Sequence, residues 1–386
     1  MKNLLENEEM TLLNEQDALE LVDSVCTTDI WRCIPADELK SVEIPNMPIF
    51  VDQIRKDYNI SKNVSDESIL EVMTSGMQLG LEVPDGIFPI GDTGFASVLA
   101  RAGFQQSSAL SGLQEKRNFI PLAPNERSVI VNLGLKTQKE SELKILIRDE
   151  KVRYVGSSDY SIIAANELFR ELKKGLISRF SEVNFVSASA SHEYFSIVYE
   201  MTDKELIKNF KSVLERNGLF CEDLRIALRL VTSDVGISAV SLVPALIADS
   251  VRRVIGAPLC VTHKDGHNID NFNEKLSLVY AMFNDCEKAL EEMEEKKLIN
   301  PKGCFLRIAK SIGFPKKLSL MKMEDFLEKF RNPTQLDLYW QIYDLYDDFD
   351  AESGGLTQTQ ILDLEEGISR CIFGGIDNYD FPYDWV

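Results

Sequence analysis

Residues 225–243 read RIALRLVTSDVGISAVSLV, and this stretch decides the fold. Two runs rich in β-branched and aliphatic residues, Arg225–Thr232 and Ile237–Val243, flank four residues of turn-forming types, Ser233-Asp234-Val235-Gly236. Alternation of this kind around a short polar link predicts a β-hairpin.

Two similar pairs of runs precede this hairpin, and amphipathic helical patterns separate the pairs. The helical patterns cover residues 164–180 and, after the N-cap residue Asp203, residues 204–216. The order hairpin, helix, hairpin, helix, hairpin predicts an α+β fold, with an antiparallel sheet of hairpins covered by helices and followed by a helical C-terminal region. The two earlier pairs are Leu143–Ile147 with Val152–Val155, and Val183–Val186 with Tyr194–Glu200.

The remaining sequence completes the expected organisation. We expect helix over the first forty residues and over Asp66–Leu79, a short helix near Phe95–Ala102, and a strand at Val129–Leu133. Beyond Asn271 the pattern is helical throughout, ending in two acidic helices over 336–346 and 357–368. Four regions are predicted: a mainly helical and loop region 1–125, an α+β core 126–270, a helical region 271–334, and an acidic arm and tail 335–386.

The charge is unevenly distributed. The formal net charge is −20, yet residues 1–50 contribute −8 and residues 335–386 contribute −11, the latter with twelve acids against Arg370 alone. The 284 residues between them carry 39 acids and 38 bases. Acidic surface of this kind points to interactions with partners and says little about the fold.

Several classes of protein are disfavoured. Apolar runs such as Ile237–Ala248 are too short and interrupted to span a membrane, and the N-terminus lacks a secretory signal pattern, so we expect a cytoplasmic protein without membrane contact. The seven cysteines form no Cys-x-x-Cys pair, which indicates reduced thiols and no metal site. Neither glycine-rich nucleotide-binding motif is present, so no cofactor is predicted.

Three short motifs allow a chemical and a structural interpretation, and the structural one is favoured each time. His263 and His267 could bind a metal or transfer protons, but Gly266 indicates a loop. Ser187–Glu193 contains Ser, His and Glu, but neighbours on a strand point to opposite faces. Asp347–Gly355 resembles a calcium loop, but Ser353 and Thr359 occupy its glycine and glutamate positions. No catalytic residue is therefore assigned.

Basic residues interleaved with aromatic ones follow the first hairpin and its helix. Cations that contact phosphates, together with rings that stack on bases, are typical of single-stranded nucleic acid binding, although helix surfaces carry Lys and Arg routinely. The candidate nucleic-acid-binding residues are Lys144, Arg148, Lys151, Arg153, Tyr154, Arg170, Lys173, Lys174 and Arg179.

The C-terminal tip alternates acids with aromatics. It resembles the acidic tips of single-stranded-DNA-binding proteins, which compete with DNA for a basic groove and dock partner proteins; alternatively, the aromatics pack on the adjacent domain. The candidate partner-binding residues are Asp380, Phe381, Tyr383, Asp384 and Trp385.

Residues 143–295 resemble a family of uncharacterised proteins encoded by phages and plasmids. The resemblance is carried by Val152–Tyr160 with the helix after it, by Ser233–Val240, by the turn containing His263, and by the charged helix from Asn273. Family members often have a Cys-Asn pair where this chain has Gly256–Cys260. The resemblance implies a mobile-element origin and a role around DNA replication, recombination or evasion of host defence, with no catalytic residue to carry over.

Two functions are therefore expected from the sequence. The first is a non-enzymatic mobile-element protein that binds nucleic acid, with the acidic C-terminal arm regulating access. The pattern of charges and aromatic residues favours single-stranded DNA as the nucleic acid. The alternative is a protein–protein interaction module, such as a phage structural or assembly component or an acidic inhibitor of a host enzyme.

Overall fold

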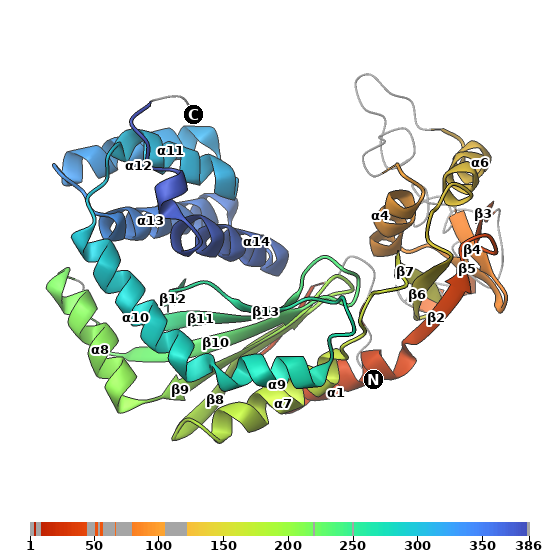
Figure 1. The fold of residues 1–386 in the computed structure, drawn as a ribbon, viewed down its shortest axis with the longest axis horizontal. Helices are drawn as coiled ribbons and strands as arrows, with labels where there is room; N and C mark the ends of the chain where they lie inside the picture. The colour runs from red at the N-terminus through yellow and green to blue at the C-terminus, as the bar shows by residue number, and fades with distance from the viewer. Residues whose placement is uncertain are drawn as a thin grey trace.

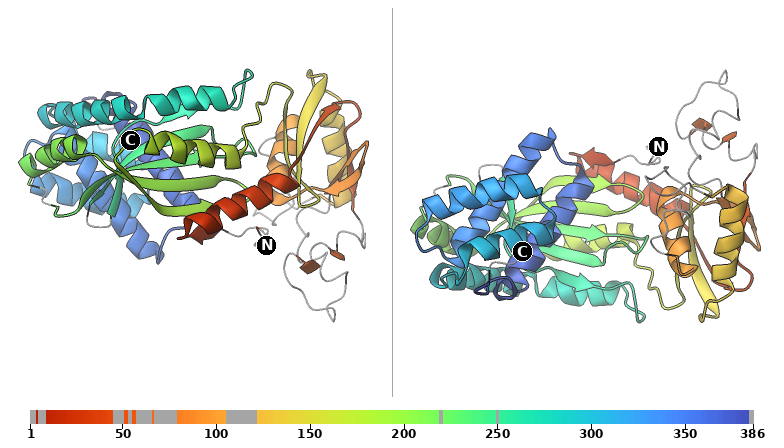
Figure 2. Two further views of the ribbon diagram at one scale, coloured as in Figure 1. Left: turned by 90° about the horizontal axis from the view of Figure 1, so that it is seen from below. Right: turned by 90° about the horizontal axis from the view of Figure 1, so that it is seen from above.

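The fold is α+β, as predicted, with a large lobe built on a curved sheet and a small lobe beside it (Figures 1 and 2). The computed structural model describes residues 4, 9–44, 51–52, 55–56, 66, 79–104, 122–218, 221–248 and 251–383. The helix predicted over Asp66–Leu79 falls almost wholly outside the described residues.

The sheet of the large lobe is antiparallel and has seven strands. Their order is β1-β8-β9-β10-β11-β12, and β13 also pairs with β11. The hairpin predicted within residues 225–243 is formed by β10 and β11, with Leu224 opposite Ala248 and Val231 opposite Ser241. The strands are β1 (Met10–Leu12), β8 (Glu182–Ala190), β9 (Phe195–Thr202), β10 (Leu224–Thr232), β11 (Val240–Ala248), β12 (Val251–Val254) and β13 (Leu259–Val261).

The turn of this hairpin is wider than predicted, so β11 begins at Val240 instead of Ile237. The main-chain N–H of Ile237 donates to the Ser233 hydroxyl at 3.2 Å, and Gly236 adopts a left-handed φ of 72°. The widened turn leaves Ile237 62% exposed, outside the sheet.

Helices cover both faces of the large sheet. The first face carries Ile226, Leu228 and Leu230 of β10 into the main hydrophobic core, and α1 and α7–α10 pack there. The alternate residues Ala227 and Arg229 face the other side, over which α13 and α14 lie (Figure 1). The helices are α1 (Glu15–Thr28), α7 (Ala165–Ile177), α8 (Lys204–Arg216), α9 (Ile269–Ser277), α10 (Val279–Glu295), α11 (Pro301–Ile312), α12 (Lys316–Lys329), α13 (Gln335–Ser353) and α14 (Gln358–Ile368).

The acidic C-terminal arm is part of the large lobe. Leu336, Ile342, Leu364 and Ile368 belong to the same core cluster as the sheet. The chain then continues through a π-helical turn (Ser369–Phe373) and a short 3₁₀ helix (Ile376–Asn378). Because the arm shares the main core, its removal would expose that core to water.

The small lobe has its own core between two three-stranded sheets and two helices. One sheet has the order β2-β6-β7 and the other β3-β4-β5. Each lobe therefore draws strands from both sides of the boundary predicted near residue 125. The elements are β2 (Ile30–Pro35), β3 (Lys40–Glu43), β4 (Leu79–Val83), β5 (Gly86–Pro89), α4 (Asp92–Arg101), α6 (Pro124–Leu135), β6 (Glu142–Arg148) and β7 (Lys151–Ser157).

Two sequence predictions are wrong. The strand predicted at Val129–Leu133 is the middle of α6, because Pro124 starts a helix and the Glu126 side chain accepts from the Ala123 N–H at 3.0 Å. The first forty residues contain strands as well as a helix, because Ile30–Pro35 pairs along β6. Among the described helices, none combines the length and apolar character needed to cross a membrane.

Candidate functional site

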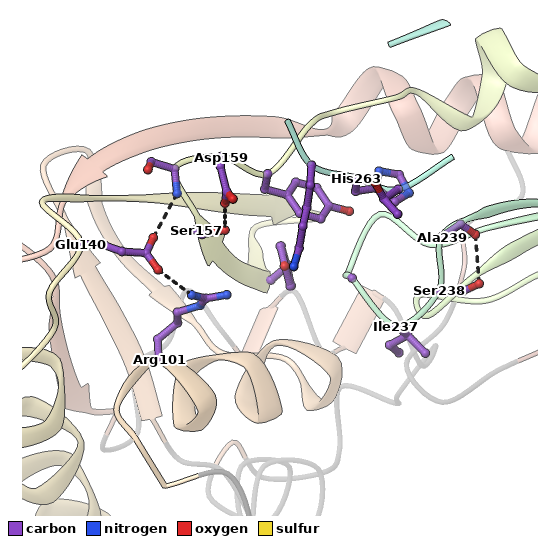
Figure 3. A pocket seen from close by; sticks show the side chains of 14 residues that line it. Arg101, Glu140, Ser157, Asp159, Ile237, Ser238, Ala239 and His263 are labelled. Carbon is purple, nitrogen blue, oxygen red and sulfur yellow. Dashed lines mark hydrogen bonds and ion pairs between the residues drawn. The ribbon is translucent and has the colours of Figure 1, made fainter. Parts of the chain in front are cut away.

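A cleft of about 690 Å³ lies between the small lobe and the β10–β11 turn of the large lobe (Figure 3). Arg101, at the end of α4, and Glu140 border it on one side, and Ile237 and Ser238 face them from the other. Sites for small ligands usually measure about 300–1,000 Å³, so the cleft has the size of a binding site.

Stacked aromatic rings form the wall of this cleft. The Tyr160 ring lies between Trp31 and His263, with centroid distances of 5.6 and 5.1 Å and interplanar angles of 22° and 4°. Tyr154 packs against Tyr160 at 4.9 Å. Trp31 and Tyr154 come from the small lobe and His263 from the large one, so the stack joins the two lobes.

A buried arginine, Arg148, also holds the junction between the two lobes. Arg148 is 0% exposed and bonds both carboxylate oxygens of Asp29, at 2.6 and 2.7 Å, and one of Asp234, at 2.7 Å. Asp29 ends α1 and Asp234 lies in the β10–β11 turn. A bidentate guanidinium with two buried carboxylates holds these three segments in one geometry.

The titratable groups in the wall favour their uncharged forms. Burial lowers the pKa of His263, whose Nδ1 lies 3.0 Å from the Ser161 carbonyl. Burial also raises the pKa of Tyr160, whose hydroxyl donates to the carbonyls of Ser233 and Asp234. Within the described ranges no cluster of His, Cys, Asp or Glu is arranged to hold a metal ion. This wall can bind and orient a ligand, and it offers no activated nucleophile.

The charges at the cleft balance. Arg101 pairs with Glu140 at 3.0 Å, and the Asp159 carboxylate accepts from the Ser157 hydroxyl. Lys264 is the second cation of the lining. Two acids and two bases give no net positive potential, so the cleft lacks the electrostatic attraction for phosphates that nucleic acid binding uses.

A second cavity, of about 280 Å³, adjoins the cleft and lies between α14 and strands β10 and β11. Ile237, Ser238 and Ala239 line both cavities. The apolar part of its lining includes Tyr194, Val231, Val243, Pro258 and Leu362, and the acidic part includes Glu193, Asp363, Glu365 and Glu366. We call this second cavity the α14 groove.

The acids of the α14 groove fall into two groups. Glu365 is buried and pairs with Arg229 at 2.7 Å and with Arg252 at 2.9 Å. In the part of the chain that the structure describes, no ion pair involves Glu193, Asp363 or Glu366. Burial, followed by repulsion from Glu9 and Asp363, raises the pKa of Glu193. The groove therefore has a surplus of negative charge.

The hairpin members of the predicted nucleic-acid site point inward or bond to the chain itself. Arg148, Lys151 and Arg153 are 0%, 7% and 1% exposed. Arg153 lies 3.2 Å from the His192 ring, and the Lys144 ammonium donates to the Tyr160 carbonyl at 2.6 Å. Of this set, Tyr154 lines the cleft.

The helical members belong to the large lobe: Arg170, Lys173 and Lys174 lie on α7 and Arg179 just after its end, and all four bond within the chain. Three of them bind acids and the fourth bonds the carbonyl end of its own helix. The pairs are Arg170 with Asp23 at 2.6 Å, Lys173 with Glu15 at 2.8 Å, Lys174 with Glu171 at 3.2 Å, and Arg179 with the Gly175 carbonyl at 2.7 Å. The nine predicted residues thus do not form a continuous basic surface, because four lie at or just after helix α7 and five in the small lobe. Four of the cations, Arg148, Arg170, Lys173 and Lys174, also pair with the chain's own acids.

The C-terminal tip packs on the large lobe as far as it is described. Asp380 is 7% exposed and accepts from the N–H groups of Ile299 and Asn300, both at 2.8 Å. The Phe381 ring lies 3.7 Å below the Arg307 guanidinium. Tyr383 is 61% exposed, and Asp384 and Trp385 lie outside the described residues. The anchoring of Asp380 and Phe381 agrees with the structural interpretation of this tip.

The other sequence candidates also have structural roles. His267 hydrogen-bonds within its own turn, to the Thr262 carbonyl at 3.0 Å, whereas His263 is held by Ser161. The supposed calcium loop is helical, since α13 continues to Ser353, and Asp348 pairs with Lys322 at 2.6 Å.

Sequence reasoning missed the α14 groove because its residues come from four segments far apart in the chain, residues 193–194, 229–243, 258–260 and 359–369. The exposed position of Ile237 follows from the widened turn, which alternation alone does not reveal. One signal was available: in α14, Asp363 and Glu366 are three residues apart and share a face, while Glu365 points elsewhere. Comparison of the chain with protein-family models, with curated proteins and with solved structures finds no match in any of the three.

Proposed function

We propose that this protein is a non-enzymatic, acidic interaction module that binds a cationic protein partner. The observation that carries the proposal is an asymmetry in ion pairing. Arg170, Lys173 and Lys174 pair with acids of the chain. Glu193, Asp363 and Glu366 of the α14 groove form no ion pair among the described residues. A surface with surplus negative charge attracts positively charged partners and repels polyanions.

The binding of single-stranded DNA stays a prediction of the sequence, and the structure gives it less support. Phosphate binding uses exposed cations, and Arg148, Lys151 and Arg153 are buried. Arg170, Lys173 and Lys174 lie at the surface, but each pairs with an acid of the chain. The acidic arm likewise belongs to the core of the large lobe, which disfavours its acting as a detachable competitor of DNA.

A mobile-element origin and a cytosolic location are part of the same proposal. The origin rests on the resemblance of residues 143–295 to phage and plasmid proteins. The location is supported by the seven cysteines, all of which are free thiols. A basic protein of the host or of the element itself would then be the partner.

The test compares two defined probes over a range of salt concentrations. A labelled single-stranded oligonucleotide and a labelled oligolysine are each titrated with the full chain, and binding is followed by fluorescence anisotropy. We expect oligolysine to bind with an affinity that falls as salt rises, and the oligonucleotide to stay free. If the oligonucleotide binds and the oligolysine does not, the proposal is wrong.

A further inference from the structure

The α14 groove combines an apolar floor, surplus negative charge and a buried hydrogen-bond donor, and each feature addresses a different part of a ligand. Its floor contains Tyr194, Val243 and Leu362, and the exposed Ile237 forms one wall. Apolar side chains exposed beside a cavity mark sites where other molecules bind. An aliphatic side chain of the partner would cover this part of the groove.

The negative charge lies on the rim of the groove. Asp363 and Glu366 are exposed on α14, and Glu193 is half-buried after β8. The carboxylate of Glu9, which accepts hydrogen bonds from the N–H groups of Gln358 and Thr359, adds a further negative charge and repels Glu193. A lysine or arginine placed here would relieve that repulsion.

The donor is the guanidinium of Arg229. The residue is 3% exposed and lines the groove, and its Nε has no hydrogen-bond partner among the described residues, although Nη1 pairs with Glu365 at 2.7 Å. A buried N–H without an acceptor loses hydrogen-bond energy that a bound carbonyl restores. The main chain of an extended peptide supplies such carbonyls.

We propose that the α14 groove binds an extended basic segment of the partner protein, in which an aliphatic side chain lies against Ile237 and Leu362 and a neighbouring lysine or arginine faces Asp363, Glu366 and Glu193. This proposal rests on the proposed function and names where and how the cationic partner binds. The adjoining cleft shares Ile237, Ser238 and Ala239 with the groove, so the segment can continue toward the small lobe.

Three short peptides test the recognition chemistry. The first has one leucine flanked on each side by two lysines, the second replaces the leucine by serine, and the third replaces the lysines by glutamates. Each is labelled and titrated with the full chain, with anisotropy as the readout. We expect the lysine–leucine peptide to bind most tightly and the glutamate peptide not to bind. Equal binding of all three would refute specific recognition.

Matched variants test the location. In the Asp363→Asn, Glu366→Gln double variant, we expect binding of the lysine–leucine peptide to weaken by about tenfold, since each exposed ion pair contributes up to about fivefold in affinity. The control neutralises Glu324 and Glu328, two exposed acids one turn apart on α12, and should bind within about twofold of the wild type. Ile237→Ser should weaken the lysine–leucine peptide and leave the lysine–serine peptide unchanged.

The outcomes separate this proposal from the proposed function. If the α12 control weakens binding as much as the α14 variant does, the peptide responds only to the net charge of the protein. In that case the α14 groove is not the binding site, but the proposed binding of a cationic partner is not contradicted. If neither oligolysine nor any lysine peptide binds, the proposed function is wrong as well.

Discussion

Replacement of Arg148 by methionine should destabilise the native state more than any exposed arginine replacement in this chain. Arg148 is 0% exposed and is the shared partner of Asp29 and Asp234, whose side chains are 9% and 7% exposed. Methionine fills much of the volume but leaves two buried carboxylates without a cation. Breaking a buried pair in this way costs about 3–5 kcal/mol.

This loss in the free energy of unfolding corresponds to a measurable shift of the melting temperature. With an unfolding entropy of about 2.1 cal/mol/K per residue, a loss of about 4 kcal/mol lowers the Tm of a 386-residue chain by about 5 °C if it unfolds as one unit. The matched control is Arg170→Met, because Arg170 is 57% exposed and pairs with Asp23 at the surface. That variant should lose less than about 1 kcal/mol.

The pH dependence of the stability loss in Arg148→Met tests whether the unpaired buried carboxylates cause that loss. Burial already raises the pKa of Asp234, against the attraction of Arg148. Without the guanidinium, the native-state pKa of Asp234 rises further above that of the unfolded chain, so the native state takes up a proton as the pH falls. The loss of stability in Arg148→Met should therefore be smaller at about pH 5 than at about pH 7.5. Calorimetry at both pH values checks this, and an equal loss at both, or a loss no larger than that of Arg170→Met, would refute the reasoning.

Three further predictions concern separate parts of the molecule. Tyr343→Phe removes the acceptor of the Val254 N–H, bonded at 2.6 Å, and should cost about 1–3 kcal/mol in urea denaturation. Glu150→Gly should raise stability by about 1 kcal/mol, because Glu150 has a left-handed φ of 59° in the two-residue β6–β7 turn; an unchanged urea midpoint would contradict this. The raised pKa of Glu193 means that its contribution to stability falls as the pH rises above 4.5, so Glu193→Gln should flatten the pH dependence of Tm there.

The elements that sequence predicts well are those in which local and tertiary preferences agree. The helix after Asp203 begins and ends at the predicted residues, because the Asp203 carboxylate accepts from the N–H groups of Glu205 and Leu206. Its apolar residues Leu206, Phe210, Val213 and Leu214 are also buried on one side of α8. Val129–Leu133 shows the opposite case. Its β-branched residues indicate a strand, but the cap at Pro124 and Glu126 and the bonds of Asn132 to β3 select a helix.

The candidate site was harder to predict, since charge alone does not show which residues are paired. Lys173 and Arg170 look like available cations in the sequence, yet their partners Glu15 and Asp23 lie about 150 residues away, on α1. Only the packing of α1 on α7 brings them together. In a protein with more acids than bases, a basic residue finds a partner within the chain more readily, so cations that look available in the sequence are paired at the folded surface.

The acids of the C-terminal arm show how one segment can serve both stability and binding. Helical periodicity turns Glu365 toward the sheet, where it meets Arg229 and Arg252, and leaves Asp363 and Glu366 on the outer face. Neutralising Glu365 would leave Arg229 and Arg252 without their carboxylate partner and destabilise the fold. Neutralising Asp363 and Glu366 would change only the charge of the groove. A partner that binds α14 as proposed would therefore contact Asp363 and Glu366, which form no ion pair among the described residues. The arm does not have to detach from the core to expose these two acids.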